Sequence, residues 1–365
     1  MNIILIILVF GVIIFFHELG HFIVAKINHI TVKEFSMGFG PKLFQFHKKE
    51  TQYTLRLIPL GGYCMMLSED DEENENDENS FEKKSIWARM AVVLAGPAMN
   101  FVIAFLFSMV IIHFCGSDPA IIGAVYNKDN IEKYQIENAE EYFNGVYPAE
   151  EAGISDGDQV LKIEGSTVKN FRELQIYLQI YGDGSPIDLT LEKEDGTVYD
   201  TTVHPAKTPD GYKIGIMSVG YQLPKNFGEL CKYSAYETRY WVKATFLSLK
   251  LIVTRQVSSD EVSGPVGVAK NMNDTFNEAA KSSVLDLFLN WMNYIVLLSA
   301  NLGVMNLLPI PGLDGGRFIF LLIEAVTRKK VPKDKENIVT LIGFVLVMLL
   351  MVVILFNDIK NVFFH

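Results

Sequence analysis

Four stretches of the chain are apolar for long enough to cross a lipid bilayer as helices, which takes about 20 residues each. They cover residues 1–27, 90–114, 285–317 and 338–357, the third ending in an irregular motif rich in proline and glycine. A secretory signal peptide is the alternative for the first stretch, but no Lys or Arg precedes it and no small-residue cleavage site follows. The pattern therefore predicts a polytopic α-helical membrane protein with four transmembrane helices.

The orientation of these helices follows from the basic residues in the short loops between them. Residues 26–89 carry nine Lys and Arg side chains and residues 317–335 carry six, whereas the chain start has none. Basic loops stay on the cytoplasmic side, so we expect the loops 28–89 and 318–337 to be cytoplasmic. Both termini and the long segment between the second and third helices are then extracytoplasmic, with the helices in the cell membrane.

The charge of the chain is concentrated in one loop. The net charge is −11, and residues 69–79 alone hold eight carboxylates, most simply as a solvated loop. No basic stripe is present, which argues against a nucleic-acid partner. Three cysteines in 365 residues cannot build a disulfide framework.

The segment 117–206 changes to the composition of a soluble domain. A short helix is stopped by Gly153, and strands are predicted at 159–163, 187–192 and 198–203 with an amphipathic helix at 171–181. The string A-G-I-x-x-G-D-x-V-L-x-I-x-G resembles a PDZ domain of the bacterial protease type. That resemblance implies an α/β PDZ-like domain whose groove takes an extended peptide as an added strand. A small α/β domain with an empty groove is the alternative.

Two further segments have amphipathic patterns. Within the linker 207–284, residues 233–253 predict a helix that lies along the membrane surface. Within the loop 28–89, residues 42–58 alternate around Lys48-Lys49-Glu50 and predict a membrane-associated β-hairpin. The free edge of such a hairpin could pair with an extended substrate, and an ordinary surface hairpin is equally consistent with the pattern.

Candidate chemistry lies inside the first apolar stretch, as His17-Glu18-Leu19-Gly20-His21. Residues four apart share one face of a helix, so both imidazoles can reach one metal ion. Glu18 lies beside them and could take a proton from a metal-bound water. Ionisable side chains at membrane depth are costly and usually functional, which favours a metal centre over an accidental motif.

A catalytic zinc site has three protein ligands and one position open to water. The third ligand must lie at membrane depth, and Asp314 in the string N-L-L-P-I-P-G-L-D-G-G-R satisfies this condition. Its two prolines and three glycines argue against a regular helix, and such backbone is tolerated where it lines a cavity. Asp286 and His113 belong at the outer ends of their helices and His47 lies in a loop, so they are weaker candidates.

These motifs together resemble a known family. The HELGH motif, the A-G-P-A-M-N string at 95–100, the PDZ-like insert, the S-G-P-V-G string at 263–267 and the L-D-G motif resemble the bacterial site-2 proteases, specifically the regulator-of-sigma-E protease branch of peptidase family M50. The resemblance covers essentially the whole chain. It departs from some relatives in having a single PDZ-like domain, which leaves the mode of substrate filtering open.

The resemblance implies an intramembrane zinc metalloprotease. His17, His21 and Asp314 are then Zn²⁺ ligands, Glu18 is the catalytic carboxylate, and Asn306 takes part in substrate handling. The implied substrates are single-pass transmembrane proteins or peptides, such as trimmed anti-sigma factors or signal-peptide remnants, cut after an upstream site-1-type protease has acted. Two alternatives belong to other classes: a catalytically inactive PDZ-bearing membrane scaffold, and a metal transporter with intramembrane histidines.

Overall fold

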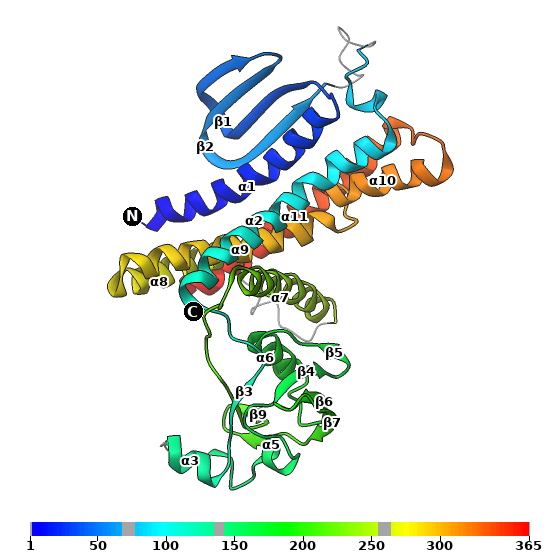
Figure 1. The fold of residues 1–365 in the computed structure, drawn as a ribbon. Coiled ribbons are helices and arrows are strands. Elements are labelled where there is room, and N and C mark those ends of the chain that lie inside the picture. The colour runs from blue at the N-terminus through cyan, green and yellow to red at the C-terminus, as the bar shows by residue number, and fades with distance from the viewer. Residues whose placement is uncertain (1, 68–76, 135–141, 255–263, 365) are drawn as a thin grey trace. The chain divides into compact units, whose positions relative to one another are not determined.

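The computed structural model describes residues 2–67, 77–134, 142–254 and 264–364 (Figure 1). It divides into two compact units, one formed by residues 1–108 with 241–365 and the other by residues 109–240. The boundary falls within two helices, α2 (Ile86–Cys115) and α7 (Phe227–Val253). Most of the acidic run 69–79 lies outside the described residues.

Four helices in the described part of the chain are long and apolar enough to cross a membrane, as the sequence predicts. They are α1 (Asn2–Ile27), α2, α9 (Val284–Leu307) and α11 (Lys333–Phe364). The second begins four residues before the predicted position 90, because Ile86, Trp87, Ala88 and Arg89 already form its first turn. Arg89 therefore belongs to this helix and not to the preceding loop.

Helix α1 packs against three other helices of its unit. Val9 and Ile13 share one buried cluster with Ile103 of α2, Ile295 of α9, and two residues of α8 (Pro265–Ser282). Farther along α1, a Cβ atom on Gly20 would lie 2.3 Å from the carbonyl oxygen of Ala95. Only glycine permits this approach of α1 to α2, and it occurs between the two histidines of the HExxH motif.

The predicted hairpin is present and is larger than the sequence indicates. Strands β1 (Val32–Lys48) and β2 (Thr51–Met66) are both bent, so that residues 34–37 pair with 52–55 on one side and with 62–65 on the other. Gly38 and Gly40 adopt the positive φ values of 86° and 87° that the bend of β1 requires. The result is a four-segment sheet that lies along α1 in Figure 1, with one parallel pairing (34–37 with 52–55) between two antiparallel ones. Residues 62–66 form one of its two edges.

The segment after α9 differs from the expected loop. The backbone is irregular at 308–313, where the two prolines fall, but a regular helix α10 (Asp314–Thr327) starts at Asp314 and covers half of the expected loop 318–337. The two glycines within this helix, Gly315 and Gly316, lie against carbonyl oxygens of Leu308 and Ile310. Glycine at these positions allows the helix to fold back onto the connector. The composition of the string N-L-L-P-I-P-G-L-D-G-G-R argues against a regular helix, but from Asp314 onward this expectation is wrong.

The second unit has the strands and helix that the sequence predicts. Strands β4 (Gln159–Ile163), β6 (Ile187–Glu192) and β7 (Val198–Val203) form a sheet with β5 (Ser166–Thr167), in the order β5-β4-β6-β7. Helix α6 (Phe171–Ile180) is capped by the Asn170 side chain. The remaining elements are short, namely β3 (Ile122–Val125), α3 (Lys128–Tyr134), α5 (Pro148–Glu151), β8 (Ala206–Thr208), β9 (Gly211–Lys213) and β10 (Ile216–Ser218).

Ionic contacts tie α6 to the first half of α7 within this unit. Arg239 donates two hydrogen bonds of 3.0 Å to the Glu173 carboxylate, and Arg172 forms an ion pair with Glu237. The sequence predicts helix α7 as residues 233–253, and the helix extends from Phe227 to Val253. Its position along a membrane surface stays a prediction.

Candidate metal centre

Helix α1 places the two histidines of the HExxH motif side by side. The four-residue spacing puts both imidazoles on one helical face, with their ring centres 4.9 Å apart. Both side chains are buried. Gly96 of α2 lies against them: a Cβ at that position would be 2.3 Å from His21 Nε2, so the space beside the imidazoles exists because residue 96 has no side chain.

Asp314 reaches the same point from a distant part of the sequence. It is the first residue of α10, and its Oδ2 lies 3.2 Å from His17 Nε2 and 3.3 Å from His21 Nε2. The two imidazole nitrogens are themselves 3.3 Å apart. The structure thus brings together the three residues that the sequence suggests as metal ligands. Among the described residues, no other set of three or more His, Cys, Asp or Glu side chains brings its possible ligand atoms this close together.

The dimensions of this triangle fit a zinc ion. In a tetrahedral site with metal–ligand bonds of about 2.0–2.1 Å, any two ligand atoms lie about 3.3–3.4 Å apart. The Asp314 Oδ2 atom is also buried without a hydrogen bond of proper geometry, although two imidazole nitrogens face it. Buried acceptor atoms that converge without hydrogen atoms between them need a cation. The donor set of two imidazoles and one carboxylate suits zinc.

The outer nitrogen of His21 is held in the state that a metal ligand needs. Its Nδ1 lies 2.8 Å from the carbonyl oxygen of Val92 in α2. A carbonyl oxygen can only accept, so Nδ1 carries the proton and Nε2 presents its lone pair to the site. Metal-bound histidines typically have such a partner on the second ring nitrogen.

Asn100 of α2 plays the same part for His17. Its side-chain amide lies 3.2 Å from His17 Nδ1, and the residue is fully buried. Asn100 Nδ2 faces the His17 ring in the structure, while Asn100 Oδ1 is buried without a hydrogen-bond partner. Rotating the amide by half a turn, which changes its shape very little, places Oδ1 as acceptor for the Nδ1 proton. That orientation leaves His17 Nε2 free for a metal. Asn100 ends the A-G-P-A-M-N string at 95–100, and no local pattern in the sequence predicts its role.

Glu18 lines the same cavity as the three residues. The cavity has a volume of about 750 Å³ and includes residues 62–67 of the sheet edge in its wall. The backbone N–H of Cys64 donates a hydrogen bond to the Glu18 carboxylate, and Gly62 packs against its side chain. The carboxylate is therefore half-buried and fixed next to the histidines, between helix and sheet.

The other candidate residues lie elsewhere. Asn306 is half-buried in the last turn of α9 and does not line this cavity. Asp286 lies in the first turn of α9, where its N–H donates to the N-cap Ser283 and its carboxylate accepts from Ser282. His113 ends α2 and His47 lies in β1, and neither is part of the three-residue group.

Comparison with known proteins assigns the chain to a family. A family model described as peptidase family M50 matches residues 5–350. The chain belongs to peptidase family M50. It is a zinc metalloendopeptidase of the site-2 protease type, and its four apolar helices make it a multi-pass membrane protein. The family that the motifs suggest is therefore confirmed, as are the expected enzyme class and cofactor.

Individual relatives align with the chain from end to end. A zinc metalloprotease RasP of Geobacillus kaustophilus is 32% identical, with 99% of this chain and 98% of the relative covered. A protein named regulator of sigma-W protease RasP, from Bacillus subtilis, is 29% identical with 98% of both chains covered. A protein of Clostridium acetobutylicum is 38% identical over 98% of this chain and 97% of its own length.

We expect Asn100→Ala to weaken zinc binding about 10-fold to 100-fold, the range for lost partners of metal-bound histidines. Asn100→Asp should retain zinc, because a carboxylate accepts the His17 Nδ1 proton at least as well as the amide oxygen. Zinc content after competition with a chelator measures both effects. Wild-type zinc retention in Asn100→Ala would contradict the assignment.

Proposed function

We propose that this protein hydrolyses peptide bonds within the transmembrane segments of single-pass membrane proteins, with His17, His21 and Asp314 holding the zinc ion. The convergence of three buried ligand atoms within 3.3 Å is the observation that carries the proposal. Zinc, when bound, polarises the scissile carbonyl and makes the attacking water more acidic.

Glu18 takes the proton of the attacking water and delivers it to the leaving amine. Its position supports this role, because the Cys64 N–H holds the carboxylate at the cavity wall beside the two histidines. The reaction is a balanced hydrolysis: water adds across the peptide bond and yields a carboxylate and an amine.

Substrate backbone would bind along the edge of the sheet. A helical substrate must unwind before it can be cut, and an extended segment can hydrogen-bond to an unpaired strand edge. Residues 62–66 form such an edge beside the metal centre, and Leu67 N–H points inward, to the Thr31 carbonyl. Because strand residues alternate, the Met66 N–H points to the same side as the Cys64 N–H that donates to Glu18, which is the side of the cavity. We assign this edge, together with Asn306, to substrate binding.

The second unit would select substrates. A groove of about 600 Å³ lies between α6 and residues 210–216, with Phe171, Leu178 and Ile216 among its apolar lining. Its shape and lining support an extended peptide as ligand, as in a PDZ domain. Lysine and arginine in the short loops support an extracytoplasmic position for this unit and for both termini, with the metal centre toward the cytoplasm. There the unit would exclude bulky ectodomains until an upstream protease has trimmed them.

The substrate class proposed is a trimmed anti-sigma factor or a signal-peptide remnant. The Bacillus subtilis relative is named a regulator of sigma-W protease, which supports a substrate that controls transcription. Signal-peptide remnants have the properties that this substrate class requires, because each is a short apolar helix without a large ectodomain.

The central test is Glu18→Gln in protein reconstituted with a tagged transmembrane peptide. We expect cleavage to fall by at least 10²-fold, the contribution typical of general acid–base catalysis. Zinc content should stay at the wild-type value, because the three ligands are untouched. His17→Ala serves as the contrast and should lose both zinc and cleavage. Undiminished cleavage by Glu18→Gln would refute the assigned role.

A second pair of variants separates the two substrate contacts. Met66→Pro removes one N–H that faces the cavity and leaves the bonds to β1 in place, so we expect a higher KM with an unchanged Tm.

Asn306→Ala tests whether the Asn306 side-chain amide stabilises the transition state, in which case kcat falls and KM is retained. Wild-type kinetics in either variant would remove that residue from the proposal.

Deletion of residues 117–206 tests the filtering role. The shortened protein should cleave a substrate that still has its full ectodomain, because the barrier to it is gone. Cleavage of the trimmed substrate by both proteins is the control for an intact metal centre. The filter is excluded if the shortened protein cuts only the trimmed substrate.

A further inference from the structure

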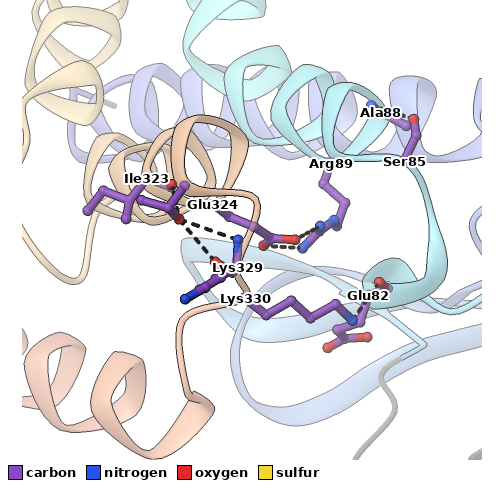
Figure 2. A network of polar contacts seen from close by, with 9 residues as sticks. Glu82, Ser85, Ala88, Arg89, Ile323, Glu324, Lys329 and Lys330 are labelled. Atoms are coloured by element: carbon purple, nitrogen blue, oxygen red, sulfur yellow. Dashed lines mark hydrogen bonds and ion pairs between the residues drawn. The ribbon is translucent and has the colours of Figure 1, made fainter.

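One buried ion pair joins two helices that contribute to the metal centre. Arg89 of α2 and Glu324 of α10 make a bidentate contact, with Nη2–Oε1 at 2.6 Å and Nη1–Oε2 at 3.1 Å. Figure 2 shows the guanidinium and the carboxylate facing each other across the space between the helices. The Arg89 and Glu324 side chains are only 8% and 16% exposed. Neither residue is assigned a role by the HExxH and L-D-G motifs.

We propose that Arg89 and Glu324 are positioning residues, whose ion pair fixes the far end of α10 to α2 and so holds Asp314 in place beside His17 and His21. This inference rests on the proposed function, in which Asp314 is a zinc ligand.

Helix α10 is not a continuation of the preceding helix α9. Asp314 is its first residue and follows the irregular connector 308–313, so the preceding helix α9 does not continue into it. Glu324 lies ten residues after Asp314, which corresponds to about 15 Å along a helix axis. The backbone there is fixed, because the N–H of Arg328, in a left-handed conformation, caps the Glu324 carbonyl. A contact at Glu324 therefore sets the direction of the helix that starts at Asp314.

Helix α2 orients the imidazole rings of the two histidines that α1 carries. Val92 accepts the His21 Nδ1 proton, and Asn100 contacts His17 Nδ1. Arg89 lies three residues before Val92, less than one helical turn away. The ion pair thus connects the third ligand's helix to the same helix that orients the first two ligands.

Apolar packing alone does not set this register. Met90 and Val93 of α2 cluster with Leu321 of α10, but apolar contacts are non-directional and tolerate a slide of one helix along the other. A bidentate arginine–carboxylate pair fixes both distance and orientation. Burial strengthens the constraint: Arg89 Nε has no hydrogen-bond partner, so Glu324 is what compensates the buried charge.

The experiment uses the full-length protein and zinc itself as the probe. We expect Arg89→Met and Glu324→Gln to transfer zinc to a chelator at least 10-fold faster than the wild type, comparable to the loss of a direct partner of a ligand. The exchanged protein, with Arg89→Glu and Glu324→Arg together, should regain most of the wild-type retention. Lys84→Ala removes a nearby positive charge that does not line the cavity, and it should retain zinc as the wild type does.

Hydrogen exchange of the zinc-free proteins gives a readout that needs neither metal nor activity. The amides of residues 317–327 should exchange faster in both single variants than in the wild type, while those of 290–305 in α9 should not change. Glu324→Asp keeps the charge and provides a folded variant if the others unfold. Its zinc should transfer to the chelator at a rate between those of the wild type and Glu324→Gln.

Three outcomes would overturn the inference: wild-type zinc transfer in both single variants, an exchanged protein no better than the worse single variant, or a lower Tm with unchanged zinc transfer. A wild-type protein that holds no zinc would instead refute the proposed function. Exchange at 317–327 would still show in that case whether the pair fixes α10.

Discussion

The proposed metal centre depends on three buried atoms that face one another. Two imidazole nitrogens and a carboxylate oxygen lie within 3.3 Å of each other, and a buried polar atom without a partner costs about 1–3 kcal/mol, so a cation at their centre would stabilise all three at once. At membrane depth the cost is harder to relieve, since water is scarce. The rest of the first unit can be understood as the arrangement that holds these atoms together.

Glycine provides the space for this arrangement. Gly20 lets α1 approach the Ala95 carbonyl, and Gly96 leaves room for the two imidazoles. In α10, Gly315 and Gly316 let the helix begin directly after a proline-containing connector and pack closely on the connector's carbonyl groups. In these places a methyl group would displace backbone or a ligand, so the close approach of the helices and the position of the ligands have one physical cause.

The cavity combines two kinds of surface with different tasks. One wall consists of the helices that carry His17, His21 and Asp314, and the other is the sheet edge at residues 62–66, where the Cys64 N–H donates to Glu18. Helical transmembrane segments have their peptide groups already hydrogen-bonded, so an enzyme that cuts them needs an alternative partner for the backbone it unwinds. Under the proposed function, the bent sheet would supply that partner beside Glu18, which gives a reason for a β-structure in a mostly helical membrane protein.

Local patterns in the sequence determine much of this protein. Length and apolarity predict four spanning helices, and a four-residue spacing places His17 and His21 on one face, because both depend on neighbours in the chain. The strands 159–163, 187–192 and 198–203 follow from alternation for the same reason. Asp314 is suggested by depth alone, but its distance to the histidines is a property of the folded chain. Asn100, the edge at 62–66 and the pair of Arg89 with Glu324 were decided only by the tertiary structure, because each acts on a residue far away in the sequence and no local pattern marks its partner.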